Sequence, residues 1–126
     1  MRELAIILKS KFFRLFYKSL LQPIFFQIEP ESIHDRMVSV GQFLGNRKLL
    51  RSLTGLFFDY QNKKLEQEVL GIKFKNPIGL GAGFDKNAQL TQILPSVGFG
   101  FAEVGSITGE PCEGNPKPRL WRLKKS

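Results

Sequence analysis

Two glycine-rich segments, 79–86 and 98–106, carry the residues of this chain whose types and spacing could do chemistry. The first follows an apolar run and ends in Asp85-Lys86, and the second follows another apolar run and ends in Ser106. Glycines allow backbone N–H groups to approach a ligand closely, and a lysine adds one positive charge. At the carboxyl ends of parallel strands, such groups suit a flat, polar cofactor.

Each of these features has a plainer interpretation when it is taken alone. Glycines in an apolar run often mark a turn or close packing, and the spacing of Gly79, Gly81 and Gly83 is not that of the dinucleotide fingerprint. A single Lys86 is more often a solvated surface residue. Its position directly after a strand end, together with the repeated pattern at 98–106, favours a cofactor site.

The elements that must position these segments are short. Strands that are buried are predicted at Ile78–Ala82 and Phe101–Gly105, with a short helix at Gln89–Ser96 between them. Strand, helix and strand in this order form a βαβ unit, so the sheet is predicted to be parallel. The run Val69–Phe74 predicts two short strands joined by a tight turn, and Arg119–Lys124 one further short strand.

The first half of the chain is predicted to be helical. Residues 1–28 repeat apolar side chains at helical spacing with basic residues between them, and Pro23 ends or kinks that helix. A second helix with one apolar stripe is predicted at 30–44, and a third helix at 47–58. Residues 59–67 are polar and are interpreted as a linker.

Two parallel strands do not make a closed domain. A parallel sheet is covered on both faces and has several more strands, and a (β/α)8 barrel needs about 250 residues. The chain has 126 residues. The sequence therefore predicts an α/β fold that is the first part of a larger protein and is incomplete as a barrel.

Composition and charge narrow the function classes. The chain is 42% hydrophobic and 24% charged, which is typical of a globular protein. Its 19 Lys and Arg outnumber 11 Asp and Glu, for a net charge of +8 at pH 7, which suits anionic lipid, nucleic acid or an acidic ligand. The basic residues are not clustered with stacking aromatic residues, so nucleic-acid binding is not predicted.

The single cysteine, Cys112, excludes a disulfide within the chain and fits a reducing compartment. It lies in a Pro/Gly/Glu-rich loop with no histidine nearby, so it is predicted to be an unreactive thiol, and no metal site is predicted. No stretch has the about 18 uncharged apolar residues of a membrane-spanning helix. A secretory signal is not predicted, since no small-residue cleavage site follows the first apolar part.

The stretch from Leu65 to Leu123 resembles the quinone-dependent, membrane-associated (class 2) dihydroorotate dehydrogenases. A similar resemblance is carried by Glu29–His34 at the start of the second predicted helix, and a helical extension of this kind separates the class from its soluble relatives. Gly81 and Gly109 stand where the family more commonly has alanine and proline. The matching segments are Leu70-Gly71, Phe74–Pro77, Gly79–Lys86, Gly98–Phe101, Glu103–Ser106 and Gly114–Leu123.

The resemblance implies a (β/α)8 TIM barrel that holds FMN. Residues 1–58 would be an N-terminal extension for membrane association and a quinone tunnel, 59–67 a linker, and 68–126 the first part of the barrel with its first two strands. The activity implied is oxidation of dihydroorotate to orotate in pyrimidine (UMP) biosynthesis, with a membrane quinone as electron acceptor.

The resemblance also implies roles for individual residues. Lys86 matches a residue that contacts both FMN and substrate, while His34 and Arg122 match positions near the mouth of the quinone tunnel. The catalytic base, a serine in this class, is expected downstream of residue 126, so no catalytic residue is assigned within the chain. Taken alone, His34 is more simply a surface histidine. The implied FMN contacts are Ala82, Gly83, Phe84, Asp85, Lys86 and Ser106.

Residues 1–28 have two interpretations. They form either an amphipathic helix packed on its own domain or a helix that lies in the bilayer interface. The resemblance favours the second, with a peripheral location on the cytoplasmic side of a bacterial inner membrane rather than in an organelle. An alternative function is a non-catalytic fragment that associates with membrane or with a partner chain and holds no flavin.

Overall fold

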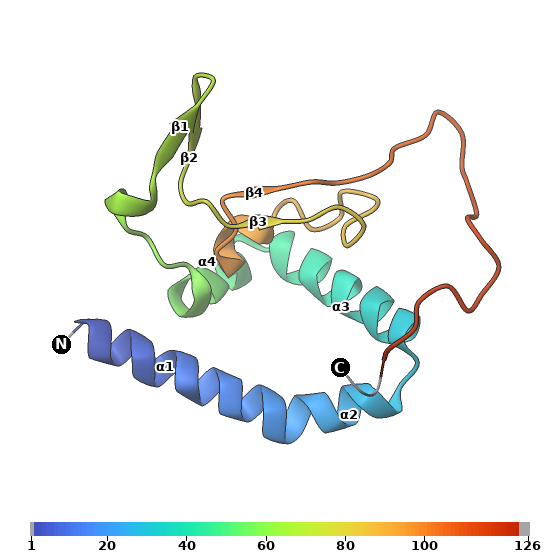
Figure 1. The fold of residues 1–126 in the computed structure, drawn as a ribbon, viewed down its shortest axis with the longest axis horizontal. Coiled ribbons are helices and arrows are strands. Elements are labelled where there is room, and N and C mark those ends of the chain that lie inside the picture. The colour runs from blue at the N-terminus through green and yellow to red at the C-terminus, as the bar shows by residue number, and fades with distance from the viewer. Residues whose placement is uncertain (1, 124–126) are drawn as a thin grey trace. The chain divides into compact units, whose positions relative to one another are not determined.

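A computed structural model describes residues 2–123, with helices in the first half of the chain and short strands in the second (Figure 1). The chain divides into two compact units. The first consists of Met1–Asp35 with Asn115–Ser126, and the second of Arg36–Gly114. Helix α3, Pro30–Gly45, begins in the first unit and ends in the second.

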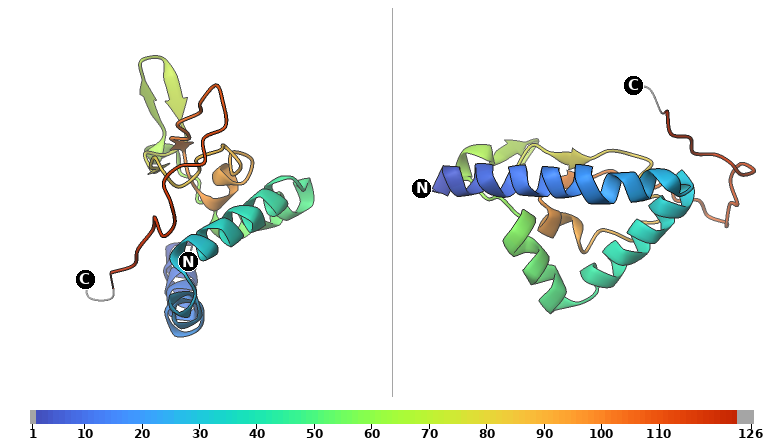
Figure 2. Two further views of the ribbon diagram at one scale, coloured as in Figure 1. Left: turned by 90° about the vertical axis from the view of Figure 1, so that its right-hand side faces the viewer. Right: turned by 90° about the horizontal axis from the view of Figure 1, so that it is seen from below.

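The first unit contains a continuous helical rod, which is clearest in Figure 2. It consists of α1 (Arg2–Phe16), a π-helical turn (Tyr17–Leu21) and α2 (Gln22–Gln27). The N–H of Gln22 donates to the carbonyl of Tyr17, which is the wide hydrogen bond of a π-turn. The sequence predicted that Pro23 ends or kinks this helix. The hydrogen-bond register changes at 17–21, just before Pro23, which has no N–H to donate. The helix does not end there but continues to Gln27.

The second unit is built on α3 and on α4, Lys48–Phe58, so the helices predicted at 30–44 and 47–58 are confirmed. Residues 90–93 pack beside Gly41 and Gly45 of α3, and the 3₁₀ turn at 94–97 packs against α4. The buried core consists of Val38, Leu90, Ile93 and Leu94, with Leu44, Leu80 and Phe99 partly buried against it.

The predicted tight turn between two short strands is confirmed. Strands β1 (Gln67–Val69) and β2 (Ile72–Phe74) form an antiparallel hairpin in which Val69 pairs with Ile72. Leu70 and Gly71 both have positive φ, 52° and 78°, which is the type I′ turn that favours glycine. The segment 59–67 also contains a 3₁₀ turn at Lys63–Leu65 and the first residue of β1.

The predicted parallel pairing is confirmed as well. Strand β3 (Gly79–Leu80) pairs with β4 (Phe101–Ala102) in parallel register, Gly79 opposite Phe101 and Leu80 opposite Ala102. The predicted strands at Ile78–Ala82 and Phe101–Gly105 are shorter than expected, and the prediction that they are buried is wrong. Ile78 is 61% exposed and Phe101 47% exposed, because a single pair of strands leaves most of its surface uncovered.

Two other predictions are corrected. The predicted helix at Gln89–Ser96 is a set of turns followed by the 3₁₀ helix Leu94–Val97, because Pro95 lacks the N–H that an α-helix would need there. The predicted strand at Arg119–Lys124 is not formed over residues 119–123, and Lys124 lies outside the described residues. Between residues 2 and 123, no helix combines the length and the apolar character needed to cross a membrane.

Candidate functional site

The two glycine-rich segments meet at one edge of the parallel strand pair. The N–H of Glu103 donates to the carbonyl of Leu80 at 2.9 Å and continues the β3–β4 pairing. Beyond the strands, the N–H of Gly105 donates to the carbonyl of Asp85 at 3.3 Å. Residues 82–86 and 105–106 are therefore neighbours beyond the carboxyl ends of β3 and β4, which is the edge where parallel α/β folds bind ligands.

Asp85 anchors this arrangement from inside the protein. It is only 1% exposed, and its two carboxylate oxygens accept hydrogen bonds from the N–H groups of Gln89 at 2.8 Å and Leu90 at 2.9 Å. The side chain thus ties the first glycine-rich segment to the turns that form the core of the second unit. The family resemblance implied that Asp85 is one of several FMN contacts. In the structure, its carboxylate instead accepts hydrogen bonds from two backbone amides of the same chain.

The remaining residues of the two segments present an accessible surface. Gly83 has a φ of +90°, and a Cβ built on Gly81 or Gly83 would meet no atom within 4 Å. Lys86 is exposed and forms no ion pair with any residue of the described part of the chain. Within residues 2–123, the backbone of Gly81 and Gly83 and the ammonium of Lys86 are therefore open to a ligand. The exposed residues of the two segments include Ala82, Gly83, Phe84, Lys86 and Ser106.

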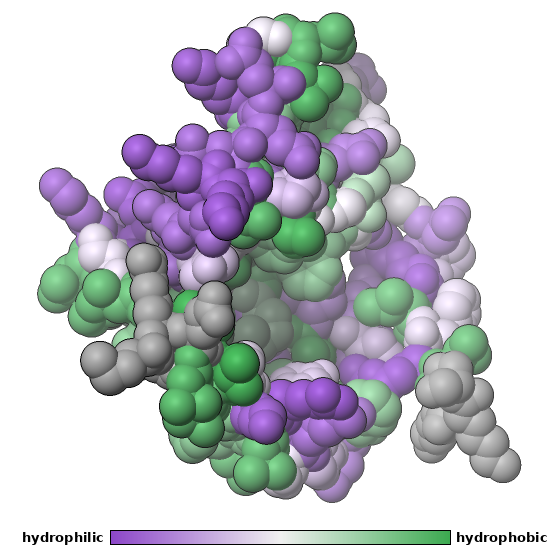
Figure 3. Space-filling model, turned by 60° about the vertical axis from the view of Figure 1, so that its left-hand side comes forward, coloured by the Kyte–Doolittle hydropathy of each residue, from purple (hydrophilic) through white to green (hydrophobic). Residues whose placement is uncertain are grey.

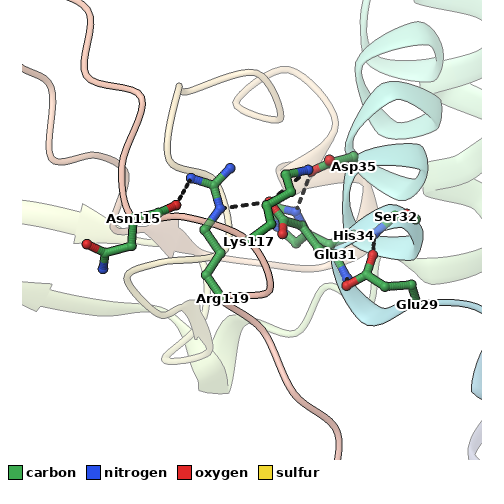
Figure 4. A network of polar contacts seen from close by, with 8 residues as sticks. All are labelled: Glu29, Glu31, Ser32, His34, Asp35, Asn115, Lys117 and Arg119. Atoms are coloured by element: carbon green, nitrogen blue, oxygen red, sulfur yellow. Dashed lines mark hydrogen bonds and ion pairs between the residues drawn. The ribbon is translucent and has the colours of Figure 1, made fainter.

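In the first unit, acidic residues organise the start of α3 (Figure 4). The carboxylate of Glu29 accepts the N–H of Glu31 at 3.0 Å and the N–H of Ser32 at 2.6 Å, which caps the helix. These two amides, that of Glu31 first, hold the pKa of Glu29 below its ordinary value.

Glu31, two residues after Glu29, contacts two basic side chains of residues 117–119. Its Oε1 atom accepts a hydrogen bond from Nε of Arg119 at 2.8 Å and lies 3.3 Å from Nζ of Lys117. The hydrogen bond from Arg119 is the main cause that lowers the pKa of Glu31. Sequence analysis did not find this cluster, because its members are 88 residues apart and no motif links them.

Arg122 binds backbone carbonyls at the C-terminal end of α2. Its guanidinium donates to the carbonyls of Phe25 at 2.9 Å and Ile28 at 3.3 Å and lies 4.5 Å from the centre of the Phe26 ring. These carbonyls lie at the C-terminal end of the helix, where a cation is favoured, and that of Phe25 also accepts the N–H of Ile28 at 3.3 Å. Trp121, beside it, is 70% exposed.

A hollow of about 350 Å³ lies between the α2–α3 corner and the end of the chain. His34 is not among the described residues that line it, and its Nδ1 atom lies 3.3 Å from the carboxylate of Asp35. Of the two residues predicted near a quinone tunnel, only Arg122 lines the hollow. The lining residues are Phe26, Gln27, Ile28, Glu29, Pro30, Pro118, Leu120, Trp121 and Arg122.

Comparison with known proteins gives consistent matches. The family model described as dihydroorotate dehydrogenase matches residues 64–126. A dihydroorotate dehydrogenase (quinone) of Christiangramia forsetii is 46% identical over 113 residues, which are 86% of this chain and 32% of the relative. One of Helicobacter acinonychis is 40% identical over 104 residues, which are 82% of this chain and 30% of the relative.

A solved structure also matches. The crystal structure of the dihydroorotate dehydrogenase of Eimeria tenella in complex with ferulenol superposes with a TM-score of 0.61 and 38% identity, over 75% of this chain and 23% of that one. The chain thus spans about a third of the length of the curated relatives that it matches. Because the family model covers half of the sequence and the relatives agree with it, the chain belongs to the dihydroorotate dehydrogenase family.

Proposed function

We propose that this chain supplies the N-terminal part of a quinone-dependent dihydroorotate dehydrogenase, which oxidises dihydroorotate to orotate in pyrimidine biosynthesis. The observation that carries the proposal is the meeting of segments 82–86 and 105–106 beyond the carboxyl ends of β3 and β4. Both segments lie within the region that the family model matches, and the relatives are named for this activity.

The proposal includes a domain organisation. Strands β3 and β4 would be the first two strands of a (β/α)8 barrel formed from residue 68 onward, since they are parallel and joined by a crossover. Residues 1–58 would form the membrane-associating and quinone-binding extension, joined to the barrel by 59–67. The helical content of residues 2–58 supports this division.

FMN is the proposed cofactor, and the residues of the site fit it. The open space over Gly81 and Gly83 admits a flat ring against the backbone, and Ser106 offers a hydroxyl donor. Held there, FMN would supply the hydride-accepting and electron-transferring chemistry that the side chains of a protein lack. The contacts proposed for it are those of Ala82, Gly83, Phe84, Lys86 and Ser106, with Asp85 contributing through its backbone.

Lys86 is proposed to bind both the cofactor and the substrate. Its ammonium group is exposed and unpaired among residues 2–123, so it is available to a carboxylate or to an oxygen that gathers negative charge. Dihydroorotate carries a carboxylate that the ammonium of Lys86 would bind, and the same charge would favour negative charge on a flavin held beside it. The proton acceptor of the reaction is not assigned to any residue of this chain.

The hollow of the first unit is the proposed quinone site. Aromatic and aliphatic side chains of Phe26, Ile28, Leu120 and Trp121 suit an apolar ring and tail. Arg122 offers a cation at the same wall. His34, on the first turns of α3, is proposed to act near its mouth.

Flavin content tests the proposed function. The protein expressed from its complete reading frame is expected to purify yellow with stoichiometric FMN, because segments 82–86 and 105–106 provide a cradle for the ring. Under anaerobic conditions, dihydroorotate should bleach the visible flavin absorbance, and a soluble quinone should restore it. A colourless protein that does not react with dihydroorotate would overturn the proposal and favour a non-catalytic fragment.

Residues 1–28 are proposed to bind a membrane surface, on the cytoplasmic side of a bacterial inner membrane. Large apolar side chains of α1 are exposed at helical spacing: Leu4, Leu8, Phe12 and Leu15 are each 58–66% exposed. Figure 3 shows hydrophobic areas open at the surface of the face that it displays. Basic residues lie beside the exposed apolar ones, as in interfacial helices that bind anionic lipid. These basic residues are Lys9, Lys11, Arg14 and Lys18.

Vesicle flotation tests this membrane proposal. A variant with Leu8→Ser and Phe12→Ser, or a protein lacking residues 1–28, is expected to lose most of its binding to anionic vesicles, since the buried apolar area falls. Val69→Ser changes an apolar residue of the hairpin that is 52% exposed, serves as the control and should float like the unaltered protein. Full flotation of the truncated protein would rule the membrane role out.

A further inference from the structure

We propose that Glu31 is a positioning residue for the quinone site, through its hold on Arg119. The inference rests on the function proposed above. It concerns residues 115–122, here called the strap, which supply Pro118, Leu120, Trp121 and Arg122 to the wall of the hollow.

The strap has no regular structure of its own. It contains no helix or strand, and within residues 2–123 no backbone hydrogen bond joins it to α2 or α3. Its place on the α2–α3 corner is therefore set by side chains. The contacts that hold it are the Arg119–Glu31 pair and the bonds from Arg122 to the carbonyls of Phe25 and Ile28, whereas the exposed Lys117 only approaches Glu31 at 3.3 Å.

Among these contacts, the Arg119–Glu31 pair is the one best placed to fix the strap. Glu31 is only 8% exposed, and Arg119 donates to it at 2.8 Å from a side chain that is 33% exposed. Figure 4 shows Arg119 extending from the strap toward Glu31. Because Arg119 lies between Pro118 and Leu120, which both line the hollow, a shift of Arg119 moves one wall of the site.

Lys117 contacts the same oxygen but contributes less. Its side chain is 65% exposed and its ammonium lies 3.3 Å from Glu31, so water competes for both groups. The other oxygen of Glu31, Oε2, is buried with no hydrogen-bond partner among the described residues. The buried carboxylate of Glu31 therefore depends mainly on Arg119, and removal of Arg119 leaves that carboxylate without its shortest contact.

Steady-state kinetics of the protein from its complete reading frame test the inference. In Glu31→Gln and Arg119→Met, the KM for a soluble quinone is expected to rise about tenfold, because one wall of the site is released. The KM for dihydroorotate and the rate of flavin bleaching should change less than about twofold, since the residues of segments 82–86 and 105–106 are untouched. Lys117→Met is the matched control and should leave both KM values near those of the unaltered protein.

Two further variants keep the result interpretable if Glu31→Gln is poorly folded. Arg119→Lys retains the charge but loses the planar donor group, so the quinone KM should lie between those of the unaltered protein and Arg119→Met. The exchange Glu31→Arg with Arg119→Glu should recover part of the quinone affinity that either single change loses. Unfolding or loss of flavin would appear in the reductive half-reaction, which is followed by stopped flow.

The outcomes separate this inference from the proposed function. If the unaltered protein is not reduced by dihydroorotate, the proposed function is wrong. If it turns over normally and the quinone KM of Arg119→Met equals that of Lys117→Met, Glu31 does not position the site. An equal rise in the KM values for quinone and dihydroorotate would also overturn the inference, because it would reveal a general loss of structure.

Discussion

Replacement of Lys86 by methionine is expected to lower kcat/KM for dihydroorotate about a hundredfold, the scale of losing one charged group that stabilises developing negative charge. Methionine retains the length of the side chain but removes the ammonium that we propose binds substrate and reduced flavin. Lys86→Arg should restore part of the activity, since it retains the charge with a different geometry. Anaerobic flavin reduction by dihydroorotate, followed by stopped flow, measures the effect on the half-reaction itself.

The control for this prediction is another exposed lysine of the same unit. Lys75 follows β2 on the hairpin side, away from the carboxyl ends of β3 and β4, and Lys75→Met should leave flavin reduction unchanged. The loss of one charged hydrogen bond lowers activity by more than about threefold. If the activity of Lys86→Met is within about threefold of that of the unaltered protein, Lys86 has no role in the chemistry.

Asp85→Ala is expected to destabilise the protein by about 3 kcal/mol, because it removes both acceptors from one buried and one partly buried backbone amide. The carboxylate holds the N–H groups of Gln89 and Leu90, and its own backbone carbonyl meets Gly105. Release of the first glycine-rich segment should also weaken flavin binding. Urea denaturation measures the stability, and the flavin that remains bound after gel filtration measures the second effect.

Asp85→Asn distinguishes the hydrogen bonds from the packing. The amide retains one acceptor oxygen and the shape of the side chain, so the loss of stability should be about half of that in Asp85→Ala. Glu68→Gln changes an exposed carboxylate on β1 and serves as the control, with little expected effect. Equal stability of Asp85→Ala and the unaltered protein would show that the two amides find other partners.

Local patterns were sufficient to predict most of the elements. The apolar stripe and the stop at Gly45 define α3, and the hairpin follows from a glycine between two short apolar runs. The helix predicted at Gln89–Ser96 did not take account of Pro95, which is a local signal against an α-helix there. Strand burial could not be predicted, because it depends on what covers a strand and not on the strand's own residues.

The sequence by itself determined the family, the helices of the first half of the chain and the two glycine-rich segments, because motif spacing and periodicity are properties of neighbouring residues. Only the tertiary structure decided what the charged side chains do. In the folded chain, the carboxylate of Asp85 accepts from backbone amides and Glu31 accepts from Arg119. Arg122 donates to a carbonyl at the end of α2. The physical reason is that an ion pair or a hydrogen bond needs two groups within about 3 Å, and the path of the whole chain decides which groups come so close.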